Sequence, residues 1–132
     1  MKRRHLTLIF LLLFTAFTAQ AQNSIDRLVD NFSTAGNAKY SSIVQRHPET
    51  RAVVRTIRTL TLQDQSIKPI KKAFDDEAGT GDTYTTMKDG HTTMVLILQA
   101  NKKKRIYTLK YRSDSHYSTG GKVSIIVTNI NQ

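Results

Sequence analysis

Few residues in this chain have side chains that could do chemistry, and none of them falls into a recognisable catalytic spacing. Three histidines after residue 21, His47, His91 and His116, lie in or beside three different predicted turns. None has the short helical or turn spacing of a zinc motif. We therefore interpret all three as surface histidines and predict no metal site.

Two polar runs contain the residue types of an enzyme. Asp75-Asp76-Glu77 lies in a predicted helix, where neighbouring residues point in different directions and Lys71 and Lys72 are within ion-pair distance. Ser113-Asp114-Ser115-His116 has the letters of a hydrolase triad, but side chains this close in one loop do not reach triad geometry. We predict no catalytic residues from either run.

The glycine pairs do not indicate a cofactor. Gly79-x-Gly81 and Gly120-Gly121 lack the strand before and the helix after that define a phosphate-binding loop. The sequence therefore favours a non-enzymatic binding or interaction module without a cofactor. A small periplasmic hydrolase or lyase with an unrecognised site is the alternative.

The first 21 residues predict export. A basic start, Lys2 to His5, precedes an apolar stretch from Leu6 to Phe17, and Ala19-Gln20-Ala21 supplies a small-x-small cleavage site. The apolar stretch is shorter than the roughly 20 residues of a transmembrane helix. We expect a cleaved signal peptide over residues 1–21 and a single domain over residues 22–132, periplasmic or extracellular, with no transmembrane segment in the mature chain.

The composition narrows the setting further. The chain has no cysteine, which excludes disulfides and a lipid-modified N-terminal cysteine. Of the 20 basic residues, three lie in the leader, so the mature chain carries 17 against 10 acidic residues, a net charge of +7. An exported domain of this size without disulfides is more typical of a bacterial envelope than of an animal secretory pathway.

The basic surplus is the one distributed functional signal. Its densest run, at a predicted hairpin tip, is our candidate anion-binding site: Lys102, Lys103, Lys104 and Arg105. Further basic residues lie in the same hairpin, in the last predicted strand and in another hairpin: Lys110, Arg112, Lys122, Arg51, Arg55 and Arg58. Nucleic acid is not the expected partner, because an exported protein rarely meets it and no aromatic residues interleave with the charges.

Anionic envelope material fits the predicted location better. Lipopolysaccharide phosphates, lipid headgroups and acidic glycans all carry the complementary charge, and another envelope protein is a further candidate partner. A basic surface that only keeps the protein soluble is the alternative interpretation.

The elements that position these residues can be read from periodicity. Apolar residues at helical spacing predict helices over 24–36 and 66–79, with Ser24 and Ser66 at the starts and Gly36 and Gly79 at the ends. Residues 39–46, 83–88 and 122–130 are expected strands, and 113–121 a loop. Residues 51–62 fit either a helix or a strand; their many β-branched residues favour a strand.

Residues 92–112 predict a central β-hairpin. Placing Leu96 opposite Tyr107 also pairs Met94 with Leu109, and the apolar side chains then share one face. The same register pairs Thr92 with Tyr111 and Leu98 with Arg105. The tip at 101–104 fits a two-residue or a four-residue loop.

The order of elements and the short connections predict the fold class. Short connections favour antiparallel neighbours, and two amphipathic helices need one face of a sheet to cover. We expect an α+β two-layer sandwich, with an antiparallel sheet of five to six strands and both helices on one face.

Four short motifs resemble a family of small exported Bacteroidetes proteins catalogued as a domain of unknown function: Ile25-Asp26-Arg27-Leu28, Arg46-x-Pro48-x-Thr50, Lys72-Ala73-Phe74-Asp75-x-Glu77 and Arg105-Ile106-Tyr107-x-Leu109-Lys110. The likeness spans most of residues 23–112. It implies a Gram-negative envelope setting and brings no catalytic or binding residues with it. Many members of that family begin with a lipid-modified cysteine, which this chain lacks.

Overall fold

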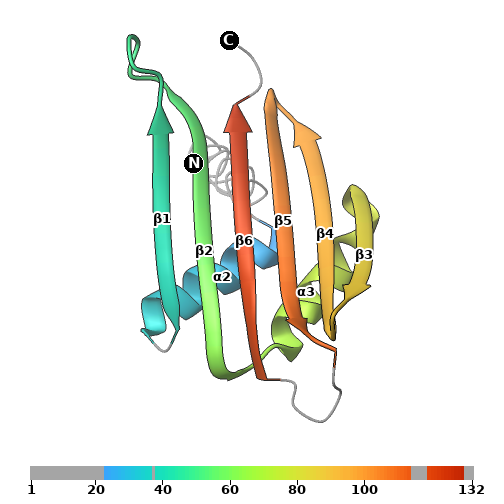
Figure 1. Ribbon diagram of the computed structural model, residues 1–132. Coiled ribbons are helices and arrows are strands. Elements are labelled where there is room, and N and C mark those ends of the chain that lie inside the picture. The colour runs from blue at the N-terminus through green and yellow to red at the C-terminus, as the bar shows by residue number, and fades with distance from the viewer. Residues whose placement is uncertain (1–22, 37, 114–118, 130–132) are drawn as a thin grey trace, which may run out of the picture.

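The computed structural model describes residues 23–36, 38–113 and 119–129 (Figure 1). The predicted signal peptide, residues 1–21, lies outside these ranges. None of the helices in the described ranges has the length and apolarity needed to cross a membrane.

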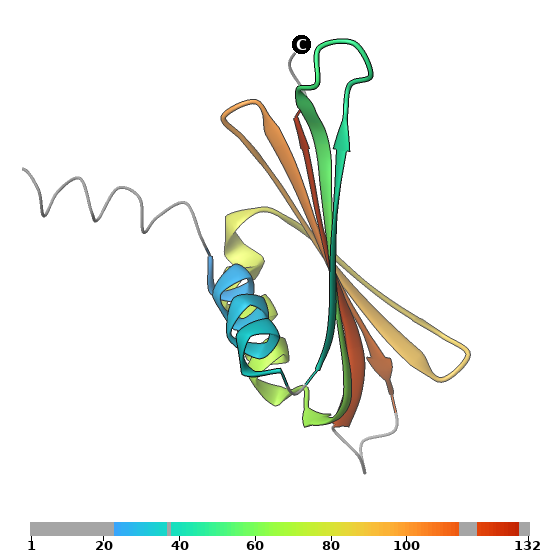
Figure 2. The same cartoon turned by 90° about the vertical axis from the view of Figure 1, so that its left-hand side faces the viewer.

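Two helices, a short 3-10 helix and six strands make up the described fold. In chain order they are α2 (Ser24–Ala35), β1 (Lys39–Arg46), β2 (Val53–Ser66), α3 (Lys68–Glu77), η1 (Ala78–Thr80), β3 (Asp82–Lys88), β4 (His91–Ala100), β5 (Lys103–Arg112) and β6 (Thr119–Asn129). The strands form one antiparallel sheet in the order β1-β2-β6-β5-β4-β3. Both helices lie on the same face, so the predicted two-layer α+β sandwich is confirmed (Figure 2).

The helix starts differ from their predicted positions by one or two residues. Asn23, not Ser24, caps α2: its side chain accepts a hydrogen bond from the Asp26 amide at 2.9 Å, and the Asp26 carboxylate accepts one from the Asn23 amide at 3.3 Å. This reciprocal capping box satisfies two backbone donors, which a cap at Ser24 would not do. Gly36 ends the helix in the left-handed region, at φ 72°, as predicted.

The predicted start of the second helix at Ser66 is wrong, because Ser66 is the last residue of β2. Its hydroxyl still accepts a hydrogen bond from the Lys68 amide, at 3.2 Å, where α3 begins. Ile67, Ile70 and Phe74 are buried, whereas Ala78, which follows the last residue of α3, is exposed in η1.

The ambiguous segment 51–62 is a strand, and β2 extends beyond it to Ser66. It pairs with β1 on one side and β6 on the other, and this double pairing suits β-branched residues better than a helix would. The last strand begins at Thr119, earlier than the predicted 122, because Thr119 still pairs with Ser66. The predicted loop over 113–121 is shortened accordingly; of this loop, residues 114–118 lie outside the described ranges.

The hairpin of β4 and β5 has the predicted register. Leu96 lies opposite Tyr107, Met94 opposite Leu109, and the two further predicted pairs are also present. Asn101 and Lys102 form the tip with φ of 54° and 63°. Positive φ at both central residues is the signature of a two-residue type I′ turn, which selects the shorter of the two predicted loops.

The core lies between the helices and one face of the sheet. The residues below 2% exposure are Tyr107, Ile25, Leu60, Ile70, Leu96, Leu109, Ile125, Val29 and Val123. They come from both helices and from four neighbouring strands, so a single apolar layer joins the two parts of the sandwich.

Candidate functional site

The face of the sheet away from the helices is the candidate site. Side chains alternate between the two faces along each strand, so every second residue points away from α2 and α3. No described element covers that side, as the edge-on view of Figure 2 shows. We call this surface the open face.

A row of isoleucines crosses the open face. The strand pairing places one isoleucine on each of five neighbouring strands, directly opposite the next: Ile43, Ile57, Ile126, Ile106 and Ile97. With strands about 4.8 Å apart, the row is about 19 Å long. Ile43, on the edge strand, is 53% exposed, and the other four are partly exposed. We call these five residues the isoleucine row.

Basic residues lie on both sides of the isoleucine row. Two residues along the strands in one direction, Arg55 and Lys104 both lie opposite Thr128. In the other direction comes a row rich in serine and threonine, followed by one containing Lys39, Lys122 and Lys110. The open face therefore combines an apolar centre with positively charged flanks.

Cations strongly outnumber carboxylates on the open face of the described strands. Within the regular strand pairing, the open face carries seven lysines and arginines against one carboxylate, Asp82: Lys39, Arg55, Lys88, Lys104, Lys110, Arg112 and Lys122. The carboxylates of the two helices lie on the other side: Asp26, Asp30, Asp75, Asp76 and Glu77. The helices also carry Arg27, Lys68, Lys71 and Lys72, so the helix side has charges of both signs. The cation excess of the open face arises from strand alternation and not from a run of like charge along the sequence.

The predicted basic run is divided among three places. Lys102 is in the turn, and Lys103 begins β5 beside it. Lys104 points to the open face, whereas Arg105 points to the helix-covered face. Arg105 Nη1 lies 3.9 Å from Asp26 Oδ2, so its charge faces a carboxylate within the protein. The structure thus brings Lys104, and not Arg105, together with the other open-face cations.

The helix-covered face holds a buried polar cluster that the sequence did not reveal. Asp26 is only 7% exposed, and the Tyr107 hydroxyl donates a hydrogen bond to its Oδ2 at 3.0 Å. Burial, together with the neighbouring Asp26 carboxylate, raises the pKa of Tyr107 to about 12. Because the Asp26 carboxylate also accepts a bond from the Asn23 amide, we interpret this cluster as the polar link between α2 and the sheet.

A hollow of about 310 Å³ lies at the end of the open face where β5 ends and β6 begins. Its lining includes four basic side chains: His91, Lys110, Arg112 and Lys122. Thr61, Gly120 and Gly121 lie between them, Leu62 and Tyr111 from the helix-covered face complete the lining, and no described carboxylate lines it. Three of these side chains are among the further basic residues noted from the sequence: Lys110, Arg112 and Lys122. The structure gathers them here, about 20 Å along β5 from Lys104.

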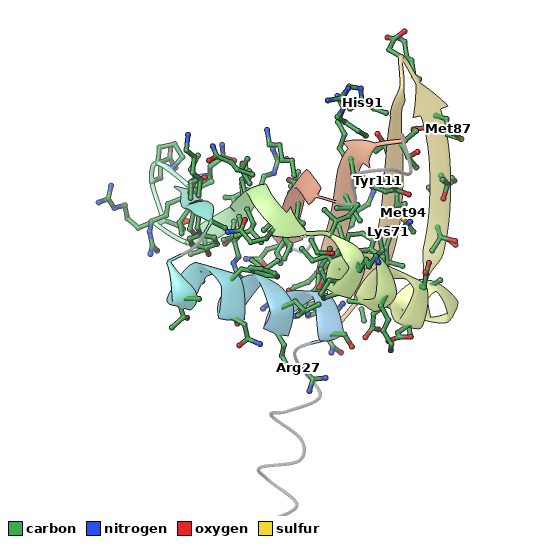
Figure 3. The ribbon with its side chains drawn as sticks, turned by 90° about the horizontal axis from the view of Figure 1, so that it is seen from below. Arg27, Lys71, Met87, His91, Met94 and Tyr111 are labelled. Atoms are coloured by element: carbon green, nitrogen blue, oxygen red, sulfur yellow. The ribbon has the colours of Figure 1, made fainter. Side chains whose placement is uncertain are left out.

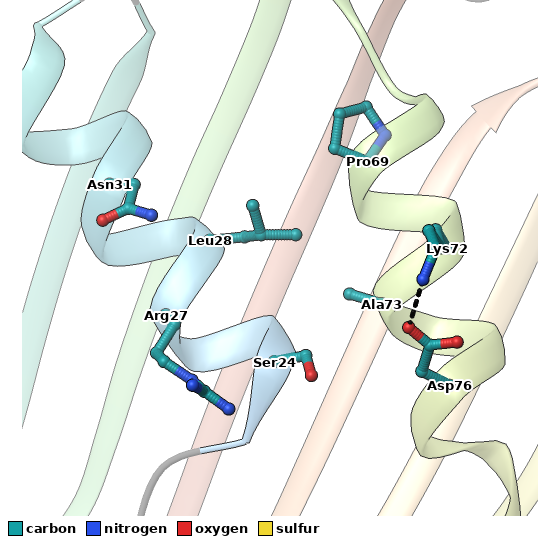
Figure 4. Close-up of a pocket in the computed structure, with 8 residues that line it drawn as sticks. All are labelled: Ser24, Arg27, Leu28, Asn31, Pro69, Lys72, Ala73 and Asp76. Carbon is teal, nitrogen blue, oxygen red and sulfur yellow. Dashed lines mark hydrogen bonds and ion pairs between the residues drawn. The ribbon is translucent and has the colours of Figure 1, made fainter. Parts of the chain in front are cut away.

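The groove between the two helices is less promising (Figure 4). It measures about 360 Å³ and is lined by residues of both helices, among them Leu28, Pro69 and Ala73. At its rim, Lys72 Nζ lies 2.9 Å from Asp76 Oδ2, an ion pair of the kind predicted for this charged helix face. No two carboxylates face each other across this groove, so it offers no acid–base pair.

The remaining candidates from the sequence have local structural partners. His47 Nδ1 accepts hydrogen bonds from the Glu49 and Thr50 amides, at 3.1 and 3.3 Å, and so supports its turn. The Ser113 hydroxyl lies 2.7 Å from that of Thr92. The rest of the triad-like run, including His116, lies outside the described residues. Where side chains are described, no three His, Cys, Asp or Glu are grouped to hold a metal.

Gly81 also has a packing role. A Cβ placed there would lie 2.3 Å from the Ile97 carbonyl oxygen, so only glycine allows β3 to begin beside β4. This close approach explains Gly81 without a phosphate.

Comparison of the chain with protein-family models, with curated proteins and with solved structures finds no match, so the likeness to exported Bacteroidetes proteins stays a prediction.

Proposed function

We propose that the protein is a non-enzymatic binding module of the bacterial envelope, and that its open face docks on an anionic lipid surface. The observation that carries this proposal is the cation excess: seven basic residues and one acidic residue share the open face with the isoleucine row. Export itself rests on the predicted signal peptide.

The combination of apolar and basic residues supports a lipid surface over a purely polar partner. Interfacial protein segments bind membranes through buried apolar area together with lysine and arginine near anionic headgroups. The isoleucine row supplies the first part, and Arg55 and Lys104 beside it supply the second. An acidic glycan matches the charge but has little apolar surface to cover the isoleucines, and Tyr84 is the one described strand aromatic on this face.

The geometry around the cations supports the same interpretation. Arg55 lies opposite Gln45 and Thr128, and Lys104 lies opposite Gln99 and Thr128, so neither faces a carboxylate across the strands. Both charges are therefore free to meet headgroups when the sheet lies flat on a bilayer. Each lysine or arginine near such a surface contributes about 1 kcal/mol of binding free energy.

Vesicle co-sedimentation of residues 22–132 tests the proposal. We expect binding to vesicles of phosphatidylcholine mixed with phosphatidylglycerol, little binding to pure phosphatidylcholine, and weaker binding as salt increases. Arg55→Gln/Lys104→Gln should weaken binding at least tenfold, because it removes two surface charges. Ile57→Thr should weaken it at unchanged charge, because it removes apolar area from the row.

The matched control is Arg27→Gln/Lys68→Gln, which removes the same charge from exposed positions on the two helices. Figure 3 shows Arg27 pointing away from the sheet. Equal weakening by the control and by the open-face variant would show that only net charge matters and would overturn the proposal. A further variant, Lys102→Gln/Lys103→Gln, measures the contribution of the predicted basic run at the hairpin tip.

Binding to an acidic polysaccharide is the competing result. In that case, alginate binds the protein as tightly as the vesicles do, and both affinities are unchanged by Ile57→Thr. That result would show that the open face binds anions through charge alone and that the lipid surface is not its partner.

A further inference from the structure

We propose that the hollow at the β5–β6 end of the open face is a binding site for a phosphate group, held by Lys110, Lys122, Arg112 and His91. This inference rests on the proposed function and sharpens it, because it assigns one headgroup chemistry to one end of the docking face. The ligand class is a phosphate monoester or free phosphate, which share the same terminal group.

The first observation is the placement of like charges directly opposite one another. Lys110 and Lys122, which carry the same charge, lie opposite each other on β5 and β6. The imidazole of His91 lies opposite Arg112 on β4 and β5. Side chains at directly opposite positions have Cβ atoms about 4.5–5.5 Å apart, and like charges there destabilise a sheet. Lys88 lies opposite His91 on its other side and adds to the same local charge.

This arrangement is particular to one end of the open face. The other basic residues there lie opposite uncharged partners: Lys39 opposite Thr61, Arg55 opposite Gln45 and Thr128, and Lys104 opposite Gln99 and Thr128. An anion between the opposed cations converts their repulsion into attraction. Without a bound anion, the Lys110–Lys122 pair lowers the stability of the sheet.

The second observation is the shape of the surface between these cations. The hollow of about 310 Å³ is roughly ten times the volume that one water molecule occupies in the liquid, so a phosphate fits with part of its hydration shell. Gly120, at φ 83°, and Gly121 contribute no side chains to it. A side chain at Gly121 would meet Ile67 at 3.0 Å, and one at Gly120 would meet the Gln63 carbonyl oxygen at 3.3 Å, so both glycines also serve close packing against their neighbours.

The orientation of His91 agrees with this role. Its Nδ1 lies 3.1 Å from the carbonyl oxygen of Asp89, which fixes the ring at the edge of the hollow. Figure 3 shows His91 pointing away from the helices, while Tyr111 points toward Lys71 of α3. The Lys71 ammonium lies 4.9 Å from the centre of the Tyr111 ring, which holds the strand from its other side.

The ligand chemistry follows from the donors. Lysine binds phosphate as a point charge, and arginine offers two parallel donors that match two phosphate oxygens. Several cations around one hollow suit a dianion better than a single carboxylate. Phosphate monoesters approach a charge of −2 near neutral pH, whereas phosphodiester headgroups carry −1.

The decisive experiment is a titration of residues 22–132 with inorganic phosphate, followed by NMR at constant ionic strength, with acetate as the monoanion control. We expect saturable shifts confined to the amides around residues 91, 110–112 and 120–122. Lys110→Gln/Lys122→Gln should weaken phosphate binding about tenfold or more, as the loss of charge-assisted hydrogen bonds predicts. Arg27→Gln/Lys68→Gln, which removes the same charge from exposed positions on the helices, should leave phosphate binding unchanged.

A second variant separates function from folding. Lys122→Glu places a carboxylate opposite Lys110, so we expect its melting temperature to rise by a few degrees, roughly, while phosphate binding is lost. A gain in stability together with retained phosphate binding would overturn the site. So would unsaturable shifts spread over the whole basic surface, or equal shifts with acetate.

Vesicles distinguish the two sources of the phosphate group. Phosphatidic acid vesicles should bind more tightly than phosphatidylglycerol vesicles of equal surface charge, and free phosphate should reduce that difference if the headgroup occupies the same hollow. If phosphate binds but the two vesicles bind equally, the ligand is a soluble phosphate. If phosphate fails to bind while Arg55→Gln/Lys104→Gln still weakens vesicle binding, the phosphate site is refuted and the proposed function stands.

Discussion

The two faces of the sheet are made by the same strands, but their cations have different neighbours. On the helix-covered face, two strand arginines meet carboxylates: Arg58 contacts Asp30, and Arg105 lies 3.9 Å from Asp26. On the open face, Lys110 and Lys122 lie directly opposite each other. Alternate positions of one strand therefore serve stability on one side and, in our proposal, binding on the other.

This difference shows how a small domain can carry a site without a cleft in its core. The covered face contains the buried apolar residues and the Asp26–Tyr107 hydrogen bond, which fix α2 on the sheet. The open face keeps its isoleucines partly exposed and its cations in solvent. Substitutions on the two faces should consequently have effects of different size and kind.

The largest expected difference is between two aspartate substitutions on the same strand. Leu109 is fully buried on the covered face, and Leu109→Asp should unfold the domain, because an unpaired buried charge costs several kcal/mol of a total of about 5–15. Ile106→Asp, on the open face, should keep a cooperative transition and lose about 1–2 kcal/mol. Urea unfolding followed by circular dichroism measures both. A folded Leu109→Asp protein would mean that the wrong face has been placed inside.

The next effect concerns the buried hydrogen bond. Tyr107→Phe leaves the Asp26 carboxylate without its hydroxyl donor, so we expect a loss of about 1–3 kcal/mol in the free energy of unfolding. Chemical denaturation at neutral pH checks this value. An unchanged stability would indicate that Asp26 finds another donor.

The same residue predicts a pH dependence. The pKa of Tyr107 is raised in the folded protein to about 12, from an ordinary value of about 10, so folding favours the neutral phenol. Its contribution is present below about pH 10 and is lost as the pH rises toward 12; it amounts to about 2–3 kcal/mol. Tyr107→Phe should flatten this part of the alkaline stability profile. Absorbance of tyrosinate should show one tyrosine that ionises late.

The smallest effect compares two arginines on β2. Arg58 contacts Asp30 and donates a hydrogen bond to the Tyr40 hydroxyl at 2.8 Å, so Arg58→Gln should cost about 1 kcal/mol. Arg55 lies on the open face, and Arg55→Gln should change stability by less than about 0.5 kcal/mol. Thermal melts of the two variants side by side give the comparison. Equal losses would show that the contacts of Arg58 are no stronger than solvation.

Local pattern was enough to predict the elements and their inward faces. The β4–β5 register follows from alternation around a short turn, since slipping by one residue would turn Leu96 and Tyr107 to the wrong face. The start of α2 was misplaced by one residue because Asn23 and Ser24 are both good caps, and only the reciprocal bond with Asp26 decides between them.

The site could not be predicted because it depends on pairing between distant strands. The isoleucine row exists only when four registers are known together, and Lys110 meets Lys122 only through the β5–β6 pairing. Asp26 and Tyr107 are 81 residues apart. No local periodicity reports such contacts, so the basic residues were identified individually while their grouping was not. The placement of Lys104 and Arg105 on opposite faces of the sheet does follow from alternation along β5.

The position of β6 has a consequence for how the chain reaches this fold. β6 is the last described strand in sequence, yet it lies between β2 and β5 and joins the two halves of the sheet (Figure 1). A chain that has emerged only as far as β5 has two separate sets of strands, each with an unpaired inner edge, and closing the sheet must wait for residues 119–129. Such long-range closure is slow. The chain therefore completes its fold late, only once residues 119–129 are available to pair with β2 and β5.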